Sequence, residues 1–133
     1  MPNTLANSNT RLLISEVLRK VSNAKTKKEK VTLLQKHNSV ALRQLMIINF
    51  DESVVSLMPE GEVPFNPNDA PVGTDHTRLE SEYRGLYRFF RGGEPKLPRA
   101  KREQMFIQLL EGLSAEEAEL LCLVKDGNLN DKY

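Results

Sequence analysis

The chain of 133 residues lacks tryptophan, contains one cysteine and two histidines, and has no long apolar run. A single cysteine, Cys122, cannot form an intramolecular disulfide, which suits a reducing compartment. No HxxxH, CxxC or HExxH spacing is present, so no zinc site is expected. No stretch approaches the roughly 18 apolar residues that a membrane-spanning helix needs. Because the N-terminal segment is polar rather than signal-like, we expect a cytoplasmic protein with no membrane partner.

The sequence also lacks the short motifs that carry catalysis or phosphate binding. It contains no G-x-S-x-G, GxxxxGK[ST] or GxGxxG pattern. Gly92-Gly93 therefore indicates the end of a helix, and Cys122, which lies among leucines, indicates a buried apolar position. The segment 125–127, Lys-Asp-Gly, is one residue short of the K-x-D-G adenylation motif and predicts a turn. We expect no catalytic residue, no metal and no cofactor, and hence a protein that is not an enzyme.

Apolar residues recur at helical spacing along most of the chain. Thr26 followed by Glu29, and Ser114 followed by Glu117, are patterns of capping boxes that open helices. Ser39 is the expected cap of a further helix. These signals predict helices over about residues 10–22, 26–36, 39–49, 75–91, 99–111 and 114–125.

Proline and glycine interrupt the middle of the chain, and this sets the expected organisation. Four prolines fall between residues 58 and 74, a segment that also carries acidic residues, so we expect a long Pro-rich acidic loop there. Residues 1–9 are Asn-rich and predict a disordered lead. The expected fold is all-α: a single helical domain over residues 10–133, built as a compact orthogonal bundle of five or six helices.

Charge is strongly segregated although the total is only +1. Residues 11–50 and 84–102 carry net charges of +7 and +6, whereas residues 51–83 and 103–133 carry −7 and −5. A polyanion could bind the basic blocks, but ordinary solvated faces paired with acidic neighbours explain them equally well. The spacing of Arg84, Arg88 and Arg91 would place them along one face of an α-helix. The candidate DNA-binding residues are Lys25, Lys27, Lys28, Lys30, Arg84, Arg88, Arg91, Lys96, Arg99, Lys101 and Arg102.

Residues 26–45, TKKEKVTLLQKHNSVALRQL, resemble the N-terminal helical DNA-binding domain of ATP-dependent DNA ligases of the T-even-phage type. The segment 106–117, FIQLLEGLSAEE, is similar to a later helix pair of that domain. The ligases' adenylation domain has no counterpart, and the Pro-rich loop departs from their pattern. The chain is also similar to small proteins of T-even-like phages of cyanobacteria. These resemblances imply a tailed-phage protein, located in the host cytoplasm, that contacts the backbone of double-stranded DNA.

Together, these observations favour a non-enzymatic, sequence-independent DNA-binding or DNA-transaction accessory protein. This interpretation predicts that the two basic blocks converge on one surface, away from the acidic loop. The alternative is a protein-interaction or virion-associated structural component that docks a phage or host protein through residues 58–74. The arrangement of the basic blocks in the fold distinguishes the two hypotheses, because scattered blocks favour the interaction protein.

Overall fold

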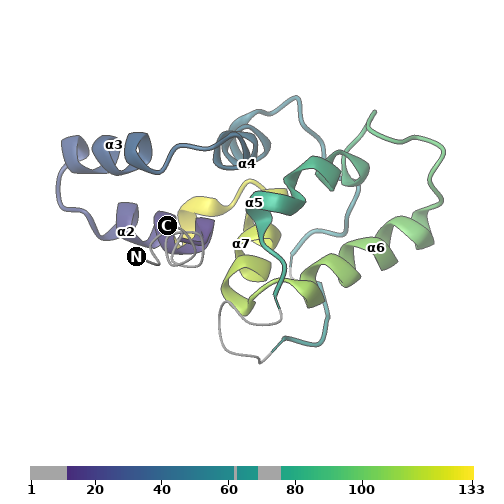
Figure 1. Cartoon of the computed structure of the whole chain (residues 1–133). Coiled ribbons are helices and arrows are strands. Elements are labelled where there is room, and N and C mark those ends of the chain that lie inside the picture. Colours follow the sequence, from purple (N-terminus) through teal and green to yellow (C-terminus); the bar gives the residue numbers. More distant parts are fainter. Residues whose placement is uncertain (1–11, 62, 69–75) are drawn as a thin grey trace.

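The computed structural model describes residues 12–61, 63–68 and 76–133, and within these ranges the chain is helical (Figure 1). They contain six α-helices and two short 3-10 helices, and their only strand-like pairings are two isolated bridges. The expected all-α bundle is therefore confirmed. None of the described helices is long and apolar enough to cross a membrane. The expected disordered lead lies outside the described residues, as do residues 62 and 69–74 of the 58–74 segment.

Of the first three helices, the second and third begin and end within one residue of the predicted positions. The first begins at Ile14 instead of at about residue 10. They are α2 (Ile14–Asn23), α3 (Lys27–Lys36) and α4 (Val40–Phe50). The Thr26 hydroxyl accepts a hydrogen bond from the Glu29 N–H at 3.1 Å, and the Ser39 hydroxyl accepts one from the Leu42 N–H at 3.1 Å. Both predicted caps are confirmed, since each satisfies an N–H that has no partner inside its helix.

The single helix expected over residues 75–91 is wrong. The structure has one α-helical turn, α5 (Leu79–Glu82), followed by a 3-10 helix, η1 (Tyr83–Phe89). After η1 the chain extends and pairs with the segment before Met58: the Leu57 N–H donates to the Phe89 carbonyl and the Arg91 N–H donates to the Val55 carbonyl, both at 2.9 Å. Because these pairings require extended backbone, the helix cannot continue to residue 91.

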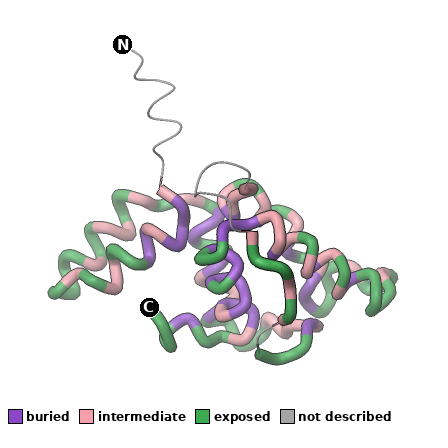
Figure 2. Tube along the Cα trace, turned by 90° about the horizontal axis from the view of Figure 1, so that it is seen from below, coloured by how far each residue is buried: buried purple, intermediate pink, exposed green. Residues whose placement is uncertain are grey.

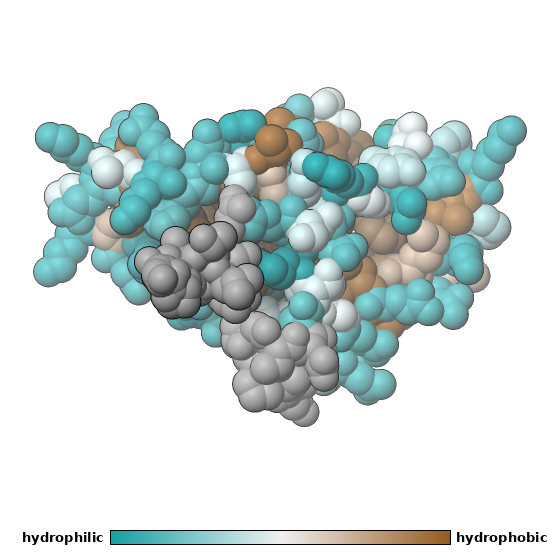
Figure 3. Space-filling model, viewed as in Figure 1, coloured by the Kyte–Doolittle hydropathy of each residue, from teal (hydrophilic) through white to brown (hydrophobic). Residues whose placement is uncertain are grey.

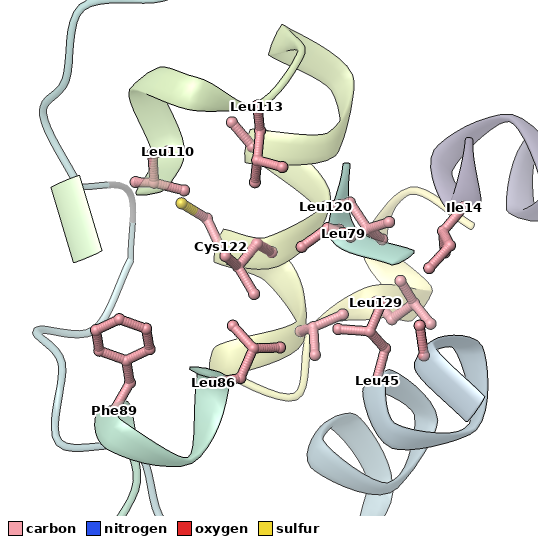
Figure 4. Close-up of a cluster of buried hydrophobic side chains, with 14 of the residues drawn as sticks. Ile14, Leu45, Leu79, Leu86, Phe89, Leu110, Leu113, Leu120, Cys122 and Leu129 are labelled. Atoms are coloured by element: carbon pink, nitrogen blue, oxygen red, sulfur yellow. The ribbon is translucent and has the colours of Figure 1, made fainter. Parts of the chain in front are cut away.

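The second half of the bundle surrounds its last long helix. It comprises α6 (Arg99–Gly112), α7 (Ala115–Lys125) and a final 3-10 turn, η2 (Leu129–Asp131). Leu120, Leu121 and Val124 of α7 are almost fully buried, and leucines from α4, α5, η1 and α6 pack around them (Figure 4). Buried residues concentrate around this core, whereas the α2–α3 end is mostly half-buried or exposed (Figure 2). Helix α3 buries no residue at all.

A buried carboxylate ties three helices together. Glu117 is the third residue of α7, and its own N–H donates to the Ser114 hydroxyl. Its carboxylate, however, accepts the Ile14 N–H and the Leu79 N–H, both at 3.1 Å. Glu117 therefore holds the starts of α2 and α5 against α7, and the reciprocal half of the expected capping box is absent. The side chain is fully buried, so these two donors replace water.

Lys125 ties the described part of the 58–74 segment to the bundle in a similar way. Its buried ammonium donates to the carbonyls of Pro59 at 2.9 Å and Gly61 at 2.7 Å, and to the Asp126 carboxylate at 2.8 Å. Gly127 follows with a φ of +72°, and the Gly127 N–H donates to the Val124 carbonyl. The turn expected at residues 125–127 is confirmed, because this backbone conformation favours glycine.

Candidate binding groove and basic surfaces

Arg102 does not belong to a binding surface. Its side chain is buried, with 7% of its area exposed, and it donates to three main-chain carbonyls. Nε donates to the Arg88 carbonyl at 2.9 Å, and Nη2 donates to the carbonyls of Glu94 and Leu97 at 3.1 and 3.0 Å. The sequence-based assignment of Arg102 to DNA binding is therefore wrong: its donors hold the turn between η1 and α6 in place.

The predicted stripe of Arg84, Arg88 and Arg91 is also wrong. A 3-10 helix has three residues per turn, so side chains three apart, rather than four apart, lie on one side. Leu86 and Phe89 are accordingly both buried, while Arg84 and Arg88 point in different directions. Arg84 and Arg91 line one groove, whereas Arg88 lines another and lies 3.6 Å from the Glu94 carboxylate.

The rest of this basic block is exposed at the start of α6 and in the turn before it. Lys96, Arg99 and Lys101 are all exposed. Arg99 Nε donates to the Glu103 carboxylate at 3.0 Å, one helical turn away. Exposed pairs of this kind contribute little free energy, so Arg99 can exchange Glu103 for another anion.

The lysine block occupies the start of α3. Lys25, Lys27 and Lys28 are exposed, but Lys30 is half-buried. The Lys30 ammonium donates to the carbonyls of Val21 at 2.8 Å and Ser22 at 3.2 Å, near the end of α2. Lys30 therefore donates to carbonyls at the end of a neighbouring helix, where its positive charge also interacts favourably with the helix dipole. Three of the four expected lysines remain available to a ligand.

The two basic blocks lie at opposite ends of the molecule. Figures 1 and 2 place α3 at one end and α6 at the other, with α4, α5 and α7 between them. Of the described elements, α3 packs mainly on α2 and makes no substantial contact with η1 or α6. The expected convergence of both blocks on one surface is therefore wrong. The cause is the connection between α2 and α3, which carries the lysines away from the core.

A surface groove between α4 and η1 is the most developed candidate site. It has a volume of about 410 Å³ and an apolar floor with two arginines at its edge. The lining residues are Gln44, Ile47, Ile48, Ser53, Val54, Tyr83, Arg84, Leu86, Tyr87, Phe90, Arg91 and Gly93. Figure 3 shows hydrophobic side chains reaching the surface over α4 and beside η1, whereas hydrophilic ones cover most of the α2–α3 end.

Helix α4 supplies one wall of the groove because it is apolar on two sides. Ala41, Leu42 and Leu45 face the core, yet Ile47 remains 46% exposed and Phe50 57% exposed. A helix that is apolar all round is normally covered on all sides. The outward side chains of α4 therefore form an apolar surface that the described chain leaves uncovered.

The 3-10 helix supplies the opposite wall together with its charges. Tyr87 is 49% exposed beside Leu86 and Phe90, which are buried. The Arg84 guanidinium lies 5.7 Å from the centre of the Tyr83 ring, and its Nε donates to the Tyr83 hydroxyl at 3.3 Å. This hydrogen bond raises the pKa of Arg84, so the side chain stays charged. Among the described residues that line the groove, Arg84 and Arg91 are the only charged ones.

The described residues offer no arrangement typical of a catalytic site. No three His, Cys, Asp or Glu side chains among them are grouped so that they could hold a metal ion. Cys122 is buried, as its apolar neighbours predict. Burial raises the pKa of Glu117, but its oxygens are engaged by backbone N–H groups of two other helices.

A comparison with family models matches residues 17–131 to a family of unknown function, DUF6433. The chain belongs to this family. The match covers every described helix from α3 onward, both walls of the groove and both basic blocks. No curated protein and no solved structure matches the chain.

Sequence reasoning missed the groove and the buried charges. The sequence does not single out Ile47 or Tyr87, although both side chains are about half exposed. The high apolar content of α4 on both sides was a usable signal for an uncovered face. For Glu117 and Lys125 no signal was available, since their partners are main-chain groups distant in the sequence. For Arg102 the partners are carbonyls of η1 and the turn after it, whose direction the sequence does not reveal.

Proposed function

We propose that this member of DUF6433 is a non-enzymatic interaction protein that docks a partner protein in the groove between α4 and η1. The observation that supports this most is the exposed apolar wall of Ile47 and Tyr87 beside Arg84 and Arg91. Tyrosine and arginine, next to a partly exposed apolar pocket, are the residue types that contribute most to protein interfaces. The separation of the two basic blocks also supports docking of a protein, because duplex binding would use a large cationic surface that the separated blocks do not form.

The test is site-specific crosslinking in the cells that naturally make the protein. A photoreactive benzoylphenylalanine replaces Gln44, in the wall of the groove, or Gln35, which is exposed on α3. We expect one discrete protein adduct from position 44 that is absent from position 35. The adduct should disappear when Arg84 and Arg91 are both changed to glutamate. Equal adducts from both positions, or none from position 44, would contradict the proposal.

A second candidate function is sequence-independent binding of duplex DNA through the arginine-rich end. It is favoured by Arg91, Lys96 and Lys101, which are exposed there and form no ion pair among the described residues. Basic side chains bind DNA chiefly through its phosphates and release counterions, so such binding weakens steeply with salt. This end presents fewer free cations than the sequence predicted, because Arg102 is buried and Arg88 and Arg99 have carboxylate partners.

The two candidates are distinguished by substitutions outside the groove and within it: Lys96 and Lys101 do not line the groove, whereas Ile47 does. Lys96→Glu with Lys101→Glu should abolish DNA binding and leave the crosslinked adduct unchanged. Ile47→Asp should remove the adduct and leave DNA binding unchanged. If Lys96→Glu with Lys101→Glu removes the adduct as well, both ligands use one surface.

A further inference from the structure

We infer that the occupant of the α4–η1 groove is an acidic segment of a partner protein that inserts a bulky apolar side chain, such as Leu or Phe, between the two arginines. This inference rests on the proposed function and names the chemistry of the partner. It combines three features of the groove: a largely apolar lining, two cations, and aromatic rings that are either buried or next to a guanidinium.

The floor of the groove accepts an apolar side chain and offers few polar partners. Ile47, Ile48, Val54, Leu86 and Phe90 come from three separate segments and converge there. Its volume of about 410 Å³ is large enough for one bulky side chain of a partner. Burying one large apolar side chain contributes roughly 1.5–3 kcal/mol, and this makes the floor the main source of affinity.

The edge of the groove selects negative charge. Arg84 and Arg91 are exposed, and neither forms an ion pair with another described residue. None of the described residues that line the groove is acidic, although Asp51 and Glu52 precede Ser53 at one end. Tyr83 holds the Arg84 guanidinium in position while its remaining N–H donors stay available. Carboxylates of a partner segment can therefore accept charge-assisted hydrogen bonds from a side chain that is already ordered.

The aromatic rings favour a protein segment over single-stranded nucleic acid. Bases bind single-strand proteins by stacking on open aromatic faces. Here the Arg84 guanidinium lies 5.7 Å from the centre of the Tyr83 ring, the Arg88 guanidinium lies 5.5 Å from the centre of the Tyr87 ring, and Phe90 is only 8% exposed. Tyr87, which is 49% exposed, is the most open of these three rings, and one open ring cannot stack successive bases of a strand. The remaining floor is aliphatic and suits the tapered side chains of leucine or phenylalanine better than the flat surface of a base.

The experiment is a fluorescence-anisotropy titration of the full chain with labelled twelve-residue peptides. One peptide is rich in Asp and Glu and carries a central Leu-x-x-Phe pair. The second replaces that pair with serine, and the third keeps the pair but replaces the acids with lysine. Single-stranded and duplex oligonucleotides serve as polyanions without apolar side chains. We expect the first peptide to bind at least tenfold more tightly than every other probe.

Variants locate the binding on the surface. The double variant Arg84→Glu with Arg91→Glu should weaken binding of the first peptide at least tenfold. The single variant Tyr87→Ser should weaken it at least fivefold. Val31→Ser is the matched control, because Val31 is 44% exposed on the distant helix α3, and it should change binding less than twofold. A second control, Lys27→Glu with Lys28→Glu on the same helix, should also change binding less than twofold. Thermal unfolding of each variant, compared with the parent, verifies that the fold is retained.

Four results would overturn the inference. Equal binding of the serine peptide would show attraction by charge alone, equal binding of the lysine peptide would show that charge is not selected, and tighter binding of an oligonucleotide would assign the groove to nucleic acid. Absence of binding by every peptide would also refute it. The proposed function fails separately: if the crosslinked adduct forms at position 44 and its partner segment is not acidic, docking stands and only the partner chemistry is wrong.

Discussion

At the scale of single residues, this protein uses charged side chains as internal connectors. Arg102, Glu117 and Lys125 are all buried, and each bonds mainly to main-chain groups; those of Glu117 and Lys125 are remote in the sequence, whereas those of Arg102 belong to η1 and the turn before α6. Removing such a group leaves donors or acceptors buried without a partner, which costs more than the bond itself contributes. These residues therefore stabilise the arrangement of helices that creates the groove, although none of them lies in it.

Glu117→Gln tests this role directly. The amide oxygen of glutamine can replace one carboxylate oxygen, but its NH₂ group cannot accept from the second backbone N–H. We expect a loss of about 1–3 kcal/mol in the free energy of unfolding at pH 7, measured by urea denaturation. Glu116→Gln, at the exposed neighbouring position, is the control and should change stability by less than about 0.5 kcal/mol.

The pH dependence of stability supplies a second test at this residue. Burial raises the pKa of Glu117 above its usual value of 4.5, although the N–H groups of Leu79 and Ile14 oppose the shift. The carboxyl group of Glu117 then binds its proton more tightly in the folded protein than in the unfolded chain. Protonation of Glu117 therefore adds fully to the free energy of unfolding below pH 4.5, and this addition is lost as pH rises through the higher folded pKa. We expect the stability difference between the parent and Glu117→Gln to shrink from pH 4 to pH 7. A difference that grows would mean that hydrogen bonding to the carboxylate outweighs burial.

At the scale of elements, the sequence predicts helices that are capped locally and fails where tertiary pairing decides. Thr26, Ser39 and Ser114 each cap a helix at the expected position, because capping depends on neighbouring residues. The helix expected at 75–91 is replaced by α5 and η1, since pairing of residues 89 and 91 with 55–57 competes with helix formation. The same change of period redirects Arg88 away from Arg84. The groove could not be predicted because it depends on that redirection.

Two glycines around η1 should respond to alanine in opposite ways. A Cβ at Gly93 would lie 1.9 Å from the Tyr87 carbonyl oxygen, a backbone atom that can move only with η1 itself. A Cβ at Gly85 would meet only Arg88 Nη1, at 3.7 Å. We expect Gly93→Ala to lower the free energy of unfolding by about 1–3 kcal/mol, and Gly85→Ala to be neutral or stabilising by up to about 1 kcal/mol. Thermal and urea unfolding measure both, and the opposite order would contradict the packing of η1 described here.

Helix α3 should open more readily than the rest of the bundle. It buries no residue and is joined to the core mainly through α2, whereas α7 is buried along most of its length. Local opening is favoured where few apolar contacts would be lost. Hydrogen exchange followed by NMR should therefore show α3 amides exchanging at least tenfold faster than those of α7. Equal protection in the two helices would indicate that α3 is held by contacts beyond those found here.

At the scale of the whole molecule, the near-zero net charge conceals a protein with cations at both ends. The lysines of α3 and the arginine-rich end are too far apart in the fold to form one compact site, as Figure 1 shows. Charge segregation along a sequence therefore does not establish a polyanion surface, because the fold decides which blocks meet. Instead, the arginines beside the apolar groove combine charge with burial, and that combination supports recognition of a partner protein.

Duplex DNA should bind only weakly, with a salt dependence set by about four phosphate contacts. At the arginine-rich end, Arg84, Arg91, Lys96 and Lys101 are exposed and form no ion pair with other described residues. Neutralising about four phosphates gives a slope of log affinity against log salt of roughly −3.6. Filter binding between 50 and 200 mM salt should give this slope or a shallower one. A slope near −7 would require both basic blocks on one duplex and would restore DNA binding as the leading function.

The most direct test of docking in the α4–η1 groove is an NMR titration of the isotope-labelled chain with the acidic Leu-x-x-Phe peptide. We predict that amide signals of Ile47, Val54, Arg84, Tyr87 and Arg91 shift together and saturate with one dissociation constant, while those of Lys27, Lys28 and Val31 stay in place. Shifts confined to α3, or a titration in which the groove signals do not move at saturating peptide, would contradict docking at this groove.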